Sequence, residues 1–186
     1  IGALRTRQEI LIWTDVGIVS MRFVGEPFIF SFTEVAEGQS LIAPNAAVSA
    51  NNRVYFMDTG GFYVYSGSAE KLPCTVLDYV LSDLNLGQSF KVFAAVNNIA
   101  NEVMWFYPSG TNTEIDKYVL YNYLENVWSI GTTDDGFTRT AWDQASILEY
   151  PIAASKNDSS NINYIYNHEK GHGNDGSDFT AYIESS

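Results

Sequence analysis

The sequence predicts an all-β fold, in which antiparallel meanders are arranged as a partial β-propeller with one short helix. Short runs of β-branched and aromatic residues recur along the chain, separated by Asn, Asp and Gly. Matched runs begin at residues 10, 54, 103 and 164, at intervals of 44, 49 and 61 residues. A period of about 40 to 50 residues is typical of a propeller blade, and residues 131–146 could supply the insertion that the longest interval needs. Since a β-sandwich can space its hairpins similarly, it is the alternative architecture.

The stretch 51–67 is the clearest hairpin. Its strands, 54–57 and 62–65, flank an Asp-Thr-Gly-Gly turn, in which Asp bonds to nearby backbone and Gly accepts a positive φ. A strand at 46–49 precedes it, which makes a three-stranded meander. The same pattern predicts strands at 10–13, 18–21, 93–96, 103–106, 118–121, 151–155 and 164–166. The large aromatic residues expected in the cores of the blades are Trp13, Phe56, Trp105 and Trp128.

The expected organisation is a single propeller-like segment, residues 1–186, of a longer chain. Its repeat units are about 1–45, 46–92, 93–150 and 151–186. Residues 1–8 are expected to be a lead-in with room for one turn of helix, so the first unit would lack an opening strand. The chain also begins with Ile1 rather than Met. Because open sheet edges invite aggregation, further blades or neighbouring chains are expected to cover them.

The apolar period changes to that of a helix over residues 75–86. Apolar residues at i, i+3, i+4 and i+7 are Leu77, Val80, Leu81 and Leu84. Thr75 is the expected N-cap, and Gly87 is expected to end the helix. The favoured interpretation is a lid packed over a blade. The alternative is a subunit contact made by Leu77, Leu81 and Leu84.

Composition and charge limit the classes of partner. The net charge is −12 and the pI is near 4.3, which argues against non-specific binding to DNA, RNA or an anionic membrane. The ten basic residues are scattered singly, apart from Arg5 and Arg7. No apolar run approaches the roughly 20 residues that a membrane-spanning helix needs. Cys74 is the single cysteine, so no internal disulfide can form.

No catalytic motif stands out, and we expect neither an enzyme nor a cofactor. The sequence has no Walker-type phosphate loop and no Gly-x-Ser-x-Gly elbow. His168 and His172 lie in a Gly-rich stretch, where a solvated loop is favoured over a metal site. Asn174, Asp175 and Asp178 are candidate calcium ligands, but their spacing differs from the EF-hand and an ordinary turn is favoured.

Several stretches carry a family resemblance. They are ILIWTDVGIVSMRFVG, VYFMDTGGFYVYSG, LPCTVLDYVLSDLN and NEVMWFYPS with DKYVLYNYLENVWSIG. Together they resemble virion proteins of tailed bacteriophages, of the packaged-DNA stabilisation and tail-nozzle type of short-tailed phages. The likeness runs across nearly the whole segment, and its motifs are structural rather than catalytic.

The resemblance implies a location and partners. Members of that family are longer, contain a β-propeller-like body, and assemble as a ring, typically of six copies, below the portal and adaptor. It therefore implies a virion location in the tail or at the head–tail junction. The implied partners are further copies of the chain and the portal, adaptor and tail proteins. Genomic DNA would pass without sequence-specific binding, and this segment would bind no membrane.

The expected function is a structural ring of the tail nozzle or head-to-tail conduit that retains and guides the genome. A strongly acidic wall fits this role, because like charge repels the phosphates of DNA that slides past. The alternative is a carbohydrate-binding or carbohydrate-cleaving propeller used at the host surface, which would need exposed aromatic residues and a pair of carboxylates in one cleft. A plain interaction module is the third possibility.

Overall fold

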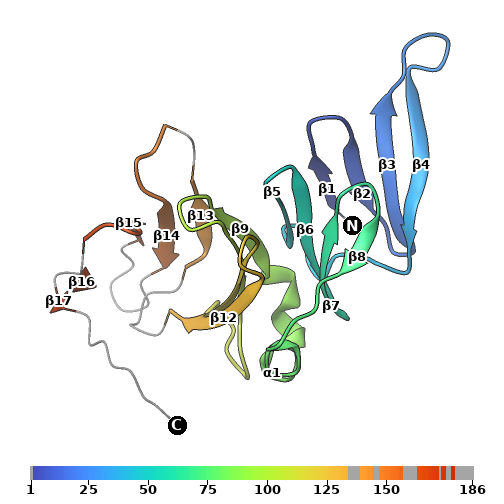
Figure 1. The fold of residues 1–186 in the computed structure, drawn as a ribbon. Coiled ribbons are helices and arrows are strands. Elements are labelled where there is room, and N and C mark those ends of the chain that lie inside the picture. The colour runs from blue at the N-terminus through green and yellow to red at the C-terminus, as the bar shows by residue number, and fades with distance from the viewer. Residues whose placement is uncertain are drawn as a thin grey trace.

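The computed structural model describes residues 2–133, 139–144, 147–156, 163–171, 173–174 and 177–178 (Figure 1). The described chain is mostly β, as the sequence predicts, with four antiparallel sheets of three or four strands. Each sheet is a meander, because strands that are consecutive in the chain are neighbours in the sheet. The four sheets also follow one another in chain order, and we number them 1 to 4.

The strands of each sheet have the following bounds. Sheet 1 contains β1 (Gly2–Arg5), β2 (Ile10–Trp13), β3 (Gly17–Phe23) and β4 (Phe30–Glu37). Sheet 2 contains β5 (Ala47–Ala50), β6 (Arg53–Asp58), β7 (Gly61–Tyr65) and β8 (Ala69–Lys71). Sheet 3 contains β9 (Phe93–Asn97), β10 (Glu102–Tyr107), β11 (Lys117–Asn122) and β12 (Val127–Thr132). Sheet 4 contains β13 (Ala141–Asp143), β14 (Ile152–Lys156) and β15 (Asn163–Asn167). The short strands β16 (Gly173–Asn174) and β17 (Ser177–Asp178) pair with each other.

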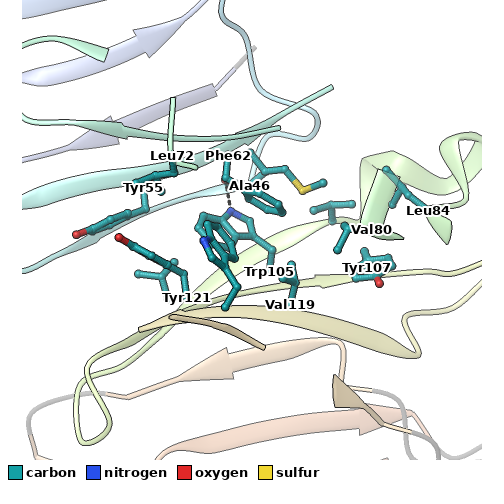
Figure 2. Packing of buried hydrophobic residues seen from close by; sticks show 14 of the residues in the cluster. Ala46, Tyr55, Phe62, Leu72, Val80, Leu84, Trp105, Tyr107, Val119 and Tyr121 are labelled. Atoms are coloured by element: carbon teal, nitrogen blue, oxygen red, sulfur yellow. Dashed lines mark hydrogen bonds between the residues drawn. The ribbon is translucent and has the colours of Figure 1, made fainter. Parts of the chain in front are cut away.

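The sheets pack face to face through three apolar clusters. The first cluster joins sheets 1 and 2 through Leu11, Trp13, Ile18, Val54, Phe56 and Tyr65. The second joins sheets 2 and 3 and includes Tyr55, Met57, Phe62, Val103, Trp105, Tyr107, Val119, Tyr121 and Trp128 (Figure 2). The third contains Met104 and Phe106 of sheet 3, with Trp142 of sheet 4 packed against it. Strands β6 and β10 are therefore apolar on both faces, because successive side chains point to opposite sides of a sheet.

The first strands of the four sheets lie side by side. Strand β1 contacts β5, β5 contacts β9, and β9 contacts β13. One alanine from each of them lines a shared cavity of about 330 Å³, namely Ala3, Ala47, Ala94 and Ala141. Small side chains at these positions let the four strands approach one another closely.

The start of the chain differs from the expected lead-in. Residues 2–5 form β1, which pairs antiparallel with β2 from Gly2↔Trp13 to Arg5↔Ile10. The Thr6 hydroxyl oxygen accepts from the Glu9 amide at 3.1 Å and builds the connecting turn. Sheet 1 therefore has its opening strand, and the expectation that the first unit lacks one was wrong.

The fourth repeat unit begins earlier than predicted. Strand β13 pairs with β14, so the predicted boundary between residues 150 and 151 falls inside sheet 4. The second strands of the four sheets begin at Ile10, Arg53, Glu102 and Ile152, at intervals of 43, 49 and 50 residues. The 61-residue interval arose from matching β15 with the second strands of the other sheets. No insertion is needed to explain the repeat.

The predicted helix exists, but it is shorter than residues 75–86. Helix α1 covers Leu77–Asp83, and Val76 occupies the N-cap position with no side-chain hydrogen bond, so Thr75 is not the cap. After Asp83 the backbone becomes extended at Leu84. The chain then enters a 3₁₀ helix, η1 (Leu86–Lys91), which contains the Gly87 expected to end the helix.

Helix α1 covers the cluster between sheets 2 and 3 (Figure 2). Val80 is fully buried there and Leu84 is 6% exposed, while Leu77 and Leu81 are partly buried against the same cluster. Of the three leucines considered as interface candidates, Leu84 therefore belongs to the chain's own core, and Leu77 and Leu81 pack against that core but keep part of their surface exposed. Leu84 in particular has little surface left to offer a neighbouring subunit.

The four aromatic residues expected in the core are buried. Trp13, Phe56 and Trp105 are fully buried and Trp128 is 8% exposed. They lie between sheets, and two of them also bond to the segments that flank sheet 2. Trp105 Nε1 donates to the Ala46 carbonyl at 3.2 Å, and Trp128 Nε1 donates to the Pro73 carbonyl at 2.8 Å. Trp142 Nε1 makes the equivalent bond to sheet 3, to the Val96 carbonyl at 3.0 Å.

We expect Gly17→Ala to destabilise the fold by about 1–3 kcal/mol, because an added methyl group would overpack a tight contact. A Cβ atom on Gly17 would collide with the backbone oxygen of Ala36 on β4, close to the register shift between these strands. The matched control is Gly60→Ala, whose Cβ would meet the Tyr63 hydroxyl at an ordinary 3.5 Å. Urea unfolding of both variants checks this, and equal losses of stability would contradict it.

Candidate interaction surface

The β3–β4 hairpin carries a group of exposed apolar side chains. It extends beyond the neighbouring strands at the upper right of Figure 1. Phe23, Phe28 and Phe32 are 72%, 76% and 63% exposed. Other exposed apolar residues of the hairpin are Val24, Ile29 and Phe30. A contiguous exposed apolar group of this kind marks a surface that another molecule or segment covers.

The exposed phenylalanines continue onto one face of sheet 1. The register pairs Ile10 with Met21, Ile12 with Val19, Met21 with Phe32, and Phe23 with Phe30. Because cross-strand partners share a face, these side chains lie on the side opposite the cluster that joins sheets 1 and 2. We name this side the outer face of sheet 1. Its large apolar residues are Ile10, Ile12, Val19, Met21, Phe23, Phe30 and Phe32, and the register places Ala3, Arg5 and Glu34 on the same side.

The outer face of sheet 1 resembles the faces that pack against other sheets inside the chain. Strand β2 reads Ile-Leu-Ile-Trp and is apolar on both sides. In this it resembles β6 of sheet 2, which packs against sheet 1 on one face and against sheet 3 on the other. A strand that is apolar on both faces is typical of a sheet with a partner on each side. The pattern makes the outer face of sheet 1 the candidate interaction surface of the described chain.

Metal ligation finds no support in the described part of the chain. Among the described residues, no group of three or more His, Cys, Asp or Glu side chains is placed to hold a metal ion. Of the calcium candidates, Asn174 and Asp178 lie in β16 and β17, but their side chains and the whole of Asp175 lie outside the described residues. His172 lies outside them too.

His168 is not in a solvated loop, contrary to the expectation. Its Nε2 accepts a hydrogen bond from Arg139 Nε at 2.9 Å, and its ring centroid lies 4.7 Å from that of Trp142. Burial, helped by the nearby charge of Arg139, lowers the pKa of His168 from 6.5 to about 4. The imidazole is therefore neutral at pH 7 and contributes to packing around sheet 4.

This pKa shift predicts that stability falls as the pH drops from 6.5 towards 4. Between these values the unfolded chain binds a proton at His168 that the folded chain does not, so the contribution is fully present above pH 6.5 and is lost below it. The slope is at most about 1.4 kcal/mol per pH unit, and partial exposure of the ring reduces it. His168→Gln should flatten the profile of unfolding free energy against pH in this range. An unchanged slope would show that other groups cause it.

The sequence matches no known family model, and no curated protein matches it. Within the described chain, no helix combines the length and the apolar character needed to cross a membrane.

Proposed function

We propose that this chain is a structural virion protein of a tailed bacteriophage, a propeller-like part of a tail-nozzle or head-to-tail ring that retains and guides the genome. The resemblance of its strand and helix stretches to tail-nozzle proteins supports the location. The structural observation that supports assembly is the apolar outer face of sheet 1 with its exposed β3–β4 hairpin. In this role the chain acts through packing and charge, without catalysis or a cofactor.

The order of the sheets supports the propeller part of the proposal. Each sheet runs outward from its first strand in chain order, and the four first strands lie side by side around a cavity of about 330 Å³. The blades of a β-propeller are arranged in this way around a central channel. In the proposed arrangement, sheets 1 to 4 are consecutive blades and a further sheet packs on the outer face of sheet 1.

The charge supports a channel through which DNA moves. A net charge of −12 repels phosphates and opposes the strong, salt-dependent adhesion that a protein rich in Lys and Arg would show. Neighbouring copies would meet through apolar surface such as the β3–β4 hairpin. The acidic surface would then be left for the channel and the solvent.

Cryo-electron microscopy of the virion that carries this chain tests the proposal. A small folded label inserted between Leu124 and Glu125, in the exposed turn between β11 and β12, would identify the chain in the density. We expect a ring around a channel below the portal. A peripheral position, with an aromatic cleft facing outward, would contradict the conduit and favour recognition of host carbohydrate.

A further inference from the structure

A polar cavity lies where the ends of sheets 1 and 2 meet. Its volume is about 490 Å³, and its lining includes Arg7, Arg22 and Arg53. The whole chain has only ten Lys and Arg residues against 22 Asp and Glu. Three of those ten basic residues are thus brought to one cavity of a strongly acidic protein.

The fold places one of the three arginines in a turn and the other two near the ends of strands. Arg7 lies in the turn between β1 and β2, and Arg22 lies near the end of β3. Arg53 begins β6, directly after the two-residue turn Asn51-Asn52, whose φ angles of 47° and 60° are left-handed. This turn is typical of a tight hairpin, and Asn tolerates it better than most residues. Both of these asparagines also line the cavity.

Among the described residues that line the cavity, Glu9 is the acidic one, and it is already engaged. Its Oε2 accepts from Arg22 Nε at 2.9 Å and from the Ser20 hydroxyl, and its Oε1 accepts from the Tyr65 hydroxyl at 2.9 Å. Burial raises the pKa of the Glu9 carboxyl, but these hydrogen bonds outweigh it and hold the pKa below its ordinary value. Glu9 is therefore ionised at neutral pH and holds Arg22 in place.

Positive charge remains in excess at this cavity. Arg7 and Arg53 make no ion pair with any described residue, and the side chains of both are exposed. Amide donors surround them, since Asn51, Asn52 and Asn98 also line the cavity. Arg53 also lies close enough to the Tyr55 hydroxyl to oppose the rise in the pKa of Tyr55 that burial causes. Two exposed guanidinium groups without ion pairs therefore line one cavity, and each can donate hydrogen bonds to an anion.

We propose that this cavity binds phosphate groups. A guanidinium donates two parallel hydrogen bonds to a phosphate, and the several oxygens of a phosphate can accept from more than one arginine. The volume lies within the range of about 300–1,000 Å³ that is typical of small-ligand sites. In a protein of net charge −12, a phosphate can approach closely only where positive charge is concentrated. The inference does not depend on the proposed virion location, although a conduit would bring DNA phosphates close to the chain.

The test compares the protein with the double variant Arg7→Ala/Arg53→Ala. Two probes are used. Binding of a fluorescent DNA duplex of about 20 base pairs is measured by its fluorescence at about 50 mM salt, and binding of pyrophosphate is measured by calorimetry. We expect the variant to bind at least tenfold more weakly, and the slope of log K against log salt for the duplex to fall by about two. Because both arginines are exposed, the variant should keep the thermal unfolding midpoint of the parent.

The matched control is Lys71→Ala/Lys170→Ala. It also removes two positive charges, but from residues that do not line the cavity. It should change binding less than twofold. Equal weakening in the control and the cavity variant would overturn the proposal, because net charge alone would then explain binding. Absence of binding to both probes would overturn it too, and would leave the ring assignment untouched.

The two probes distinguish the source of the phosphate. If the duplex binds, if pyrophosphate displaces it, and if the cavity variant binds it more weakly, the ligand is a nucleic-acid backbone. Binding of pyrophosphate alone identifies a small phosphate compound. Arg53→Lys is expected to recover only part of the lost affinity, since lysine keeps the charge but cannot donate the paired hydrogen bonds.

Discussion

Trp105→Ala is expected to cost about 3–5 kcal/mol of folding free energy, the range for removing a large aromatic side chain from a core. The indole is fully buried, and its ring centroid lies 4.7 Å from that of Phe62 and 6.1 Å from that of Trp128 (Figure 2). The substitution also removes the bond from Nε1 to the Ala46 carbonyl. That carbonyl keeps its bond from the Met57 amide, so most of the loss comes from packing between sheets 2 and 3.

Urea unfolding followed by circular dichroism measures this loss. The matched control is Val127→Ala on β12 of the same sheet, where the side chain is 53% exposed and the expected cost is below about 1 kcal/mol. If Trp105→Ala costs no more than the control, the second cluster does not hold sheets 2 and 3 together.

The triple substitution Phe23→Ser/Phe28→Ser/Phe32→Ser is expected to weaken self-association by a hundredfold or more. Burying each phenylalanine contributes about 1.5–3 kcal/mol, and 1.4 kcal/mol corresponds to a factor of ten. All three side chains are largely exposed, so the hairpin itself should still fold. Sedimentation velocity over a range of protein concentrations measures the change.

Control substitutions separate this surface from general hydrophobicity. Val16→Ser and Leu124→Ser remove exposed apolar side chains that lie outside the β3–β4 hairpin, and they should leave association unchanged. If the triple variant associates as strongly as the parent, the outer face of sheet 1 is not where copies of the chain meet. In that case another sheet of the protein, or a different protein, would be the partner to seek.

Long apolar strands could be predicted from the sequence, and short edge strands could not. The hairpin formed by β6 and β7 is evident from its aromatic runs and its Asp-Thr-Gly-Gly turn. By contrast, β8 reads Ala-Glu-Lys and β13 reads Ala-Trp-Asp, with three residues each and no apolar alternation. Such strands form because the neighbouring strand offers free backbone groups, which local sequence does not reveal. Missing β13 also displaced the start of the fourth repeat unit.

The helix shows a different limit. The spacing of its leucines predicted a helix with one apolar face, and that face exists. The spacing could not say that sheets 2 and 3 would occupy it, nor that Leu84 would reach the core from an extended backbone after the last turn. An amphipathic pattern predicts that one face of a helix is buried, but it does not identify the part of the protein that buries it.

The candidate surfaces depend on register, which the sequence does not specify. The Ile-Leu-Ile-Trp run of β2 predicts burial on both sides, but not that one side continues onto exposed phenylalanines. Arg7, Arg22 and Arg53 are far apart in the sequence. They line one cavity because β3 pairs with β2 beside the β1–β2 turn and because sheet 2 packs on sheet 1. Only the assembled sheets bring these side chains together.

The stacking of the sheets also predicts which parts of the protein unfold locally most easily. Each apolar cluster joins two successive sheets, so the protein resembles a linear array whose stability is a sum over nearest neighbours. In such an array the ends can fray while the centre stays folded. Amide hydrogens of β6 and β10, which carry buried residues on both faces, should therefore exchange with solvent most slowly, and those of β15 much faster.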